Sequence, residues 1–202
     1  MYTRGMRPET RHGTAKTAAG SSRDRMDAMT DAWRQEVPEF ERPESEFIRR
    51  TARLEQLLEE ALSECLLPWN LTRADFNVLS ILRTAGAPYE LRPTDIRNRL
   101  LLTSGGVSNI LNRLERLGLA ERVPDGDDRR ISWVRLTGAG IEVIEDAMRA
   151  WSAVQDQMFA GLDPQLAHQA SDTLRTILLI LGDREPAAAA TRQPDEKTPR
   201  VL

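Results

Sequence analysis

The sequence predicts a mainly α-helical chain with a small β-hairpin: a winged helix-turn-helix with N- and C-terminal dimerisation helices. Two observations predict this fold class. Three apolar patterns of helical spacing follow one another closely over residues 72–117, and two short strand patterns joined by a charged turn come directly after them. Long amphipathic patterns lie before and after this core. No strand–helix–strand alternation, Gly-rich phosphate loop or internal repeat appears.

Length and composition indicate one domain or a small pair of them. The 202 residues are 40% hydrophobic and 29% charged, and no apolar run approaches the roughly 20 residues of a membrane span. The basic N-terminus lacks the apolar stretch of a secretory signal. The one cysteine excludes an internal disulfide and fits a reducing, cytoplasmic location. We expect a disordered basic tail (1–22), an extra helix and turn (23–43), the winged helix-turn-helix with its dimerisation helices (44–182, core 72–137) and a second disordered tail (183–202).

Catalytic and metal-ligating residue types are scarce in this chain. The two histidines, His12 and His168, lie far apart in the sequence, and neither is near Cys65. A zinc cluster, a Ser-His-Asp triad and a Cys-His dyad therefore have little to be built from. We therefore expect a protein that is not an enzyme and that has no catalytic residue, no metal site and no cofactor. An enzyme is kept as a remote alternative.

The N-terminal elements are predicted as two helices separated by a turn. A short helix over 23–36 contains Trp33, and Pro38 and Pro43 bracket the turn that follows it. A long amphipathic helix then runs from Glu44 to about Leu67, where Pro68 stops it. Cys65 on this helix is predicted to be a buried structural residue, with a peroxide-sensing thiol as the alternative.

Three short helices form the predicted core. Thr72 caps the first helix (72–84), with Asp75 completing an approximate capping box. Pro93 begins the second helix, which runs to about Leu101. Thr103 or Ser104 caps the third helix, which continues to residue 117. Its apolar positions are Val107, Ile110, Leu111, Leu114 and Leu117.

A charged hairpin and two further helices complete the chain. The predicted strands are 119–123 and 132–136, and Thr137 caps a helix to about residue 160. The last helix starts at Asp163-Pro164 and ends at Gly182. Its apolar stripe predicts a dimer interface and consists of Leu166, Leu174, Ile177, Leu178 and Leu181. The tryptophans expected to anchor the core or an interface are Trp69, Trp133 and Trp151.

Charge is distributed unevenly along the chain. The net charge is −3, but the segment 92–135 holds nine arginines and six acidic residues. A basic module in an acidic chain is typical of proteins that bind the phosphate backbone of nucleic acids. A solvated surface with interspersed ion pairs is the alternative.

The third helix and the hairpin loop carry the predicted DNA contacts. Polar side chains lie off the apolar stripe of the third helix, which suits entry into the major groove, and Arg113 could read guanine or hold a phosphate. Arg129 and Arg130 at the hairpin tip suit a narrow minor groove, where Asp128 could orient an arginine. Taken alone, both sets could be ordinary solvent-facing residues. The candidate DNA-binding residues are Thr103, Ser104, Ser108, Asn109, Asn112, Arg113, Asp128, Arg129 and Arg130.

The wing region resembles the MarR family of bacterial transcription factors. The matching run is GLAERVPDGDDRRISWVRLTGAG, which contains a basic residue, an Asp, Asp-Arg-Arg and a closing Leu-Thr-x-x-Gly. Upstream, LTRADFNVLSILR and VSNILNRLERLGL are similar to helices of that family, so the resemblance covers about Glu44 to Gly182. It implies a homodimer with interlocking terminal helices that binds a pseudopalindromic operator. It also implies that Asp128 positions Arg130 in the minor groove.

The amino end resembles the PecS-like, urate-responsive branch of this family, which has an extra N-terminal helix carrying a tryptophan. The resemblance implies a ligand site at Trp33, Asn77, Ile110 and Arg122. Asn77 and Ile110 replace an aspartate and an arginine of that branch, which implies a less charged ligand than urate. Trp33 could instead be a hydrophobic anchor for its helix.

The sequence thus predicts a DNA-binding transcriptional regulator, a repressor released or modulated by a small-molecule effector. Its partners are double-stranded DNA, a second copy of the chain and the effector, with no membrane. A winged-helix protein-interaction module without operator binding is the alternative.

Overall fold

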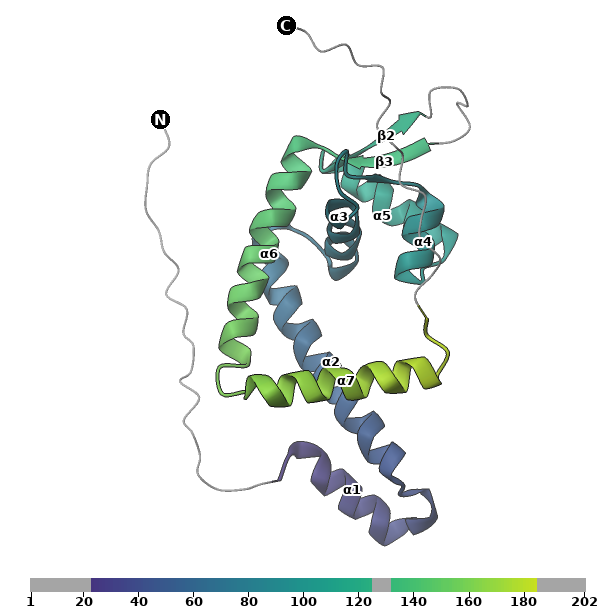
Figure 1. The fold of residues 1–202 in the computed structure, drawn as a ribbon, viewed down its shortest axis with the longest axis vertical. Helices are drawn as coiled ribbons and strands as arrows, with labels where there is room; N and C mark the ends of the chain where they lie inside the picture. The colour runs from purple at the N-terminus through teal and green to yellow at the C-terminus, as the bar shows by residue number, and fades with distance from the viewer. Residues whose placement is uncertain (1–22, 125–131, 185–202) are drawn as a thin grey trace, which may run out of the picture. The chain divides into compact units, whose positions relative to one another are not determined.

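A computed structural model describes residues 23–124 and 132–184. The chain divides into two compact units, Met1–Gln56 and Leu57–Leu202. The described residues contain seven α-helices and three short strands (Figure 1). This confirms the mainly helical fold class with a small antiparallel sheet. The predicted division into tails, extra helix and winged domain stays a prediction.

The first unit holds α1 (Arg25–Glu36), a 3-10 turn (Pro38–Phe40) and most of α2 (Pro43–Leu66). Asp24 caps α1 through a capping box with Asp27, so the helix begins two residues later than predicted. Arg50 of α2 pairs with both carboxylates, at 2.7 Å from Asp24 and 2.8 Å from Asp27. The hydrogen bond from Arg50 lowers the pKa of Asp24. Charged contacts therefore bind α1 to α2.

The second unit is built around the predicted core. Thr72 and Asp75 form the expected capping box of α3 (Arg73–Thr84), and α4 (Pro93–Leu100) begins at Pro93 as predicted. Thr103, and not Ser104, caps α5 (Ser104–Arg116). The last two helices are α6 (Gly138–Met158), capped by Thr137, and α7 (Pro164–Ile180), capped by Asp163.

The sheet contains one strand that the sequence did not predict. Its order is β1-β3-β2 and all its pairs are antiparallel. The hairpin strands β2 (Ala120–Pro124) and β3 (Ser132–Leu136) lie within one residue of their predicted positions, with Arg122 opposite Val134. The additional strand β1 (Glu90–Leu91) pairs with Arg135 and Val134. Two residues are too few to show the alternation by which strands are recognised.

The core lies where α3, α4, α5 and α6 meet the sheet. Its members share almost complete burial of apolar side chains and include Leu66, Phe76, Val78, Leu79, Leu82, Leu91, Ile96, Leu111, Leu114, Val134 and Ile144. Trp133 is buried, and Trp69 and Trp151 pack against the core, as expected for anchoring residues. Across the described ranges, every helix falls short of the length or the apolar character that a membrane span requires.

Candidate DNA-binding interface

Helices α4 and α5 form a compact helix-turn-helix. Leu101 ends α4 in a left-handed conformation (φ 52°), and its N–H donates to the carbonyl of Arg97. Two residues later, the Thr103 hydroxyl accepts from the N–H of Gly106 at 3.1 Å and starts α5. Because both helix ends are satisfied within the turn, the direction of α5 relative to α4 is well defined.

One face of α5 is buried and the other is open. Val107, Leu111 and Leu114 point into the core. The exposed face holds five of the predicted DNA-binding residues: Thr103, Ser104, Ser108, Asn109 and Asn112. The structure therefore gathers short side chains with donors and acceptors along one accessible helix face, the type of surface that reads base edges in a major groove.

Arg113 does not belong to this exposed group. Its Nε donates to Oδ2 of Asp75 at 2.9 Å, and its second guanidinium nitrogen donates to the carbonyl of Asn70 at 2.6 Å. The expectation that Arg113 reads guanine or holds a phosphate stays a prediction, and these bonds within the domain hold two of its three guanidinium nitrogens. The sequence could not show this, since the partners lie 38 and 43 residues earlier in the chain.

Arg122, predicted as a ligand residue, lies against the same helix. It extends from β2, donates to Oδ1 of Asn112 at 3.0 Å and pairs with Glu115 at 3.2 Å. Asn112 is thus tied to the wing while remaining exposed. A predicted DNA-binding residue and a predicted ligand-binding residue are in direct contact here.

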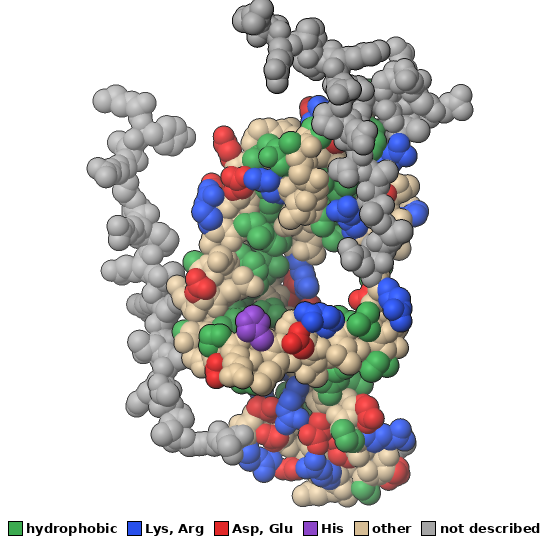
Figure 2. Space-filling model, viewed as in Figure 1, with side chains coloured by type: hydrophobic (Ala, Val, Ile, Leu, Met, Phe, Trp, Pro, Cys, Tyr) green, Lys and Arg blue, Asp and Glu red, His purple; other side chains and the backbone are tan. Residues whose placement is uncertain are grey.

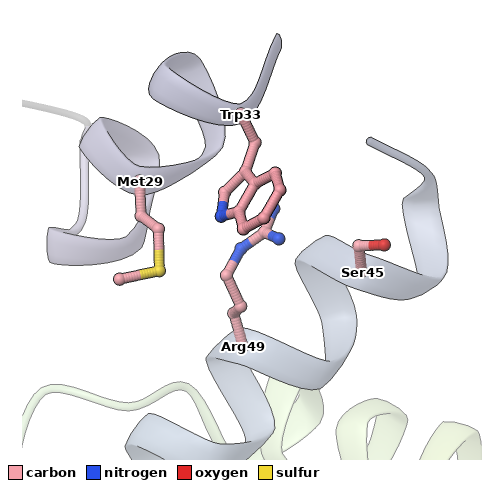
Figure 3. Close-up of a pocket in the computed structure, with 4 residues that line it drawn as sticks. All are labelled: Met29, Trp33, Ser45 and Arg49. Carbon is pink, nitrogen blue, oxygen red and sulfur yellow. The ribbon is translucent and has the colours of Figure 1, made fainter. Parts of the chain in front are cut away.

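The other predicted ligand residues lie on different elements. Asn77 of α3 and Ile110 of α5 are both partly buried, and Ile110 packs against the core. Trp33 belongs to the first unit, where it helps to line a cavity of about 650 Å³ between α1 and α2, and its indole ring points toward Arg49 (Figure 3). Met29 and Ser45 are further lining residues among those that the structure describes.

Two arginines that the sequence did not single out as site residues make specific hydrogen bonds in the structure. Arg49 bonds both carboxylate oxygens of Glu41 at 2.8 Å and the Thr30 hydroxyl at 3.0 Å. Arg97, in the last turn of α4, reaches the Ser104 hydroxyl at 3.4 Å, beside the start of α5. No motif marks Arg49, whereas the excess of arginine over 92–135 already included Arg97.

The structure describes the base of the wing, where two arginines make specific contacts. Arg135 of β3 pairs with the buried carboxylate of Glu90 in β1 at 2.7 Å, and the Arg92 guanidinium lies 4.9 Å from the Trp133 ring centroid. The tip residues Asp128, Arg129 and Arg130 lie outside the described residues. Their roles stay predictions.

In the part of the chain that the structure covers, no group of three or more His, Cys, Asp or Glu side chains could hold a metal ion. Cys65 is partly buried, and burial raises the pKa of its thiol. That direction agrees with the prediction of a structural cysteine.

Comparison with known proteins shows which family this chain resembles. Residues 69–131 match the MarR family. The chain is 32% identical over 116 residues to the HTH-type transcriptional regulator PecS of Dickeya dadantii, covering 57% of this chain and 70% of PecS. It is also 32% identical over 90 residues to the multiple antibiotic resistance protein MarR of Escherichia coli, covering 45% and 60%.

Solved structures of the family share the fold. Sco5413, a MarR family transcriptional regulator from Streptomyces coelicolor, superposes with a TM-score of 0.62 and 27% identity over 71% of this chain and 99% of its own. Wild-type MarR of E. coli gives 0.55 and 25% over 64% and 95%. A MarR variant complexed with operator DNA gives 0.60 and 23% over 72% and 97%, a likeness of fold.

The helix-turn-helix, the open polar face of α5 and the adjoining wing define a winged-helix DNA-binding protein. The match to PecS makes the assignment specific: the chain belongs to the MarR family of transcriptional regulators.

Proposed function

We propose that the protein is a homodimeric, cytoplasmic repressor that binds a pseudopalindromic operator, is released by a small-molecule effector and catalyses no reaction. The exposed polar face of α5 carries this proposal, because it presents Ser104, Ser108, Asn109 and Asn112 together on a helix whose start is fixed by a tight turn. Two copies of this helix in a dimer would enter two half-sites of an operator. Bound protein would then exclude the polymerase from an overlapping promoter.

In the proposed DNA contact, residues have separate tasks. Thr103 and the side chains of α5 meet the major groove, and Arg129 and Arg130 of the wing, with Asp128 as the orienting carboxylate, meet the minor groove. Arg113 is left out of the base-reading set because Asp75 and Asn70 hold it. The MarR variant solved with operator DNA supports this arrangement by its fold.

The effector is proposed to act at Trp33, Asn77, Ile110 and Arg122. Support comes from Arg122, which contacts both Asn112 and Glu115 of α5, so that a ligand competing for this guanidinium would disturb the DNA-reading helix. The effector must bind the released conformation more tightly than the DNA-bound one, since equal affinities would shift no population. Asn77 and Ile110 favour a molecule less charged than urate.

Binding to a selected operator tests the function. The best-binding duplex is selected from a random library by the wild-type protein, and its affinity is titrated against salt beside an unrelated duplex of equal length. We expect tight binding to the selected duplex alone, with log K falling steeply against log salt as phosphate contacts displace counterions. Arg130→Ala should lower this affinity while the dimer stays intact. Weak and equal binding to both duplexes, with a shallow salt slope, would instead favour the protein-interaction module.

A further inference from the structure

Asp75 caps α3, but this role does not require the negative charge of its carboxylate. It is 1% exposed and accepts at Oδ2 from the N–H of Thr72 at 2.9 Å and from the Thr72 hydroxyl at 2.8 Å. A neutral Asn or Gln could accept the same bonds. Burying a charge carries a large desolvation cost unless a partner offsets it. The charge at this position therefore indicates a partner beyond the helix cap.

That partner is Arg113, which reaches back from α5. Its Nε bonds the same Oδ2 at 2.9 Å, and its other nitrogen bonds the Asn70 carbonyl at 2.6 Å. Asn70 stands in a left-handed conformation (φ 53°) at the turn just before α3. One guanidinium thus joins this turn, the first turn of α3 and the C-terminal half of α5.

We propose that Asp75 is a positioning residue for DNA recognition, which acts through Arg113 to set the orientation of α5. This inference rests on the proposed function. Ser108, Asn109 and Arg113 belong to one continuous helix, so fixing the helix at Arg113 directs the exposed side chains one turn earlier. Binding groups have to be held within about 0.5 Å of their productive geometry. A loosened α5 would still meet phosphates but would lose its alignment with base edges.

The wing base contains a matched control. Glu90 is buried like Asp75, and Arg135 donates to it from Nε at 2.8 Å. This pair joins β1 to β3 and includes no residue of α5. Asp75–Arg113 and Glu90–Arg135 are both pairs of a buried carboxylate with an arginine. Only the Asp75–Arg113 pair includes a residue of α5.

The experiment compares Asp75→Asn, the double variant Asp75→Asn/Arg113→Met and the control Glu90→Gln. Each is titrated with the duplex selected by the wild-type protein and with an unrelated duplex, at a temperature where circular dichroism shows it folded. Active concentration is set by stoichiometric titration. We expect the ratio of the two affinities to fall about tenfold in Asp75→Asn, roughly the loss of one base contact. We expect Glu90→Gln to leave this ratio unchanged.

The double variant separates positioning from stability. It leaves no buried charge, so its stability should recover toward the wild-type value, while the affinity ratio should stay low because α5 has lost its attachment. Should Asp75→Asn fail to fold, the double variant carries the test alone. An affinity ratio that stays at the wild-type value, or that recovers together with stability, would overturn the inference and leave the proposed function intact. A wild-type protein that selects no sequence would overturn both.

Discussion

Gly140 lets α6 begin directly against the backbone of the wing. A Cβ built on it would lie 1.9 Å from the carbonyl oxygen of Leu119. Thr137 fixes this approach from both sides: its hydroxyl accepts from the N–H of Gly140 at 3.0 Å and donates to the Gly118 carbonyl at 2.7 Å. The Leu-Thr-x-x-Gly run therefore has a structural reason, since it clamps the start of α6 onto the entry to β2.

Gly140→Ala should destabilise the fold by roughly 3 kcal/mol, because the new methyl group meets backbone that cannot rotate away. The measurement is the free energy of unfolding from urea titration. Gly138→Ala is the matched control: it lies in the same first turn of α6 and has nothing within 4 Å of its Cβ position. That control should be neutral or stabilise by about 0.5–1 kcal/mol. Equal effects of the two substitutions would contradict the clamp.

Cys65 should be a slow thiol. Burial raises its pKa, so at neutral pH a smaller fraction is thiolate than in an exposed cysteine. We expect iodoacetamide at pH 7.5 to alkylate the native protein about tenfold more slowly than the urea-unfolded chain, as followed by intact mass. Faster reaction in the native state would contradict a structural role and restore the peroxide-sensing alternative.

At the scale of elements, α1 depends on charge for its attachment to α2. Arg50 of α2 lowers the pKa of Asp24, the cap of α1, and Arg23, just before α1, lowers the pKa of Asp31 within that helix. For carboxyl groups whose folded-state pKa is lowered, the stabilisation is present above the unfolded value of 3.8 and is lost as pH falls through the folded value. As the pH falls, α1 should therefore lose stability before helices whose caps are uncharged.

Hydrogen exchange corrected for intrinsic rates tests this expectation. Between about pH 5 and pH 2 we expect the amides of residues 25–36 to lose protection. The amides of α6, whose cap is the Thr137 hydroxyl, serve as the internal reference and should keep their protection longer. Equal loss in both helices would indicate general acid unfolding and would refute a charge-dependent α1.

Most elements of the fold could be predicted from the sequence because their ends are coded locally. Thr72, Thr103 and Thr137 each bond a backbone N–H within three residues, and Pro93 starts its helix by its fixed φ. The strand β1 could not be predicted in this way. It exists because Glu90 and Leu91 pair with β3, more than forty residues later in the chain.

The candidate site was predictable to a similar extent. The open face of α5 follows from its apolar spacing, since Val107, Leu111 and Leu114 define the buried side. The placement of Arg113 depends on Asp75 and Asn70, and that of Arg122 depends on Asn112 and Glu115. Such tertiary contacts of long side chains leave no local pattern in the sequence.

At the scale of the whole molecule, α7 leaves an apolar surface open. No residue of this helix is buried, although Leu166, Leu174 and Leu178 follow one another at helical spacing. Hydrophobic side chains lie at the surface along α7 beside its charged ones (Figure 2). Leu174 and Leu178 also line a hollow of about 530 Å³ on this helix. A stripe of this kind is expected to be covered by another surface, and a second copy of the chain is the occupant that the proposed homodimer supplies.

Leu178→Glu should therefore break the dimer and, with it, operator binding. A charge at the centre of an apolar interface carries a large desolvation cost, so we expect the dissociation constant of the dimer to rise at least about a hundredfold. Sedimentation velocity over a concentration series measures this change, and circular dichroism checks that the monomer stays folded. The control is Gln169→Glu, which adds the same charge to the opposite face of α7 and should leave the dimer intact. Because an operator with two half-sites needs two α5 helices held together, the Leu178→Glu protein should bind the selected duplex no better than an unrelated one at concentrations where the wild type saturates it.

Two outcomes would contradict these expectations. A Leu178→Glu protein that remains dimeric would place the dimer interface elsewhere. A Leu178→Glu monomer that still discriminates the two duplexes would show that a single α5 helix suffices for recognition.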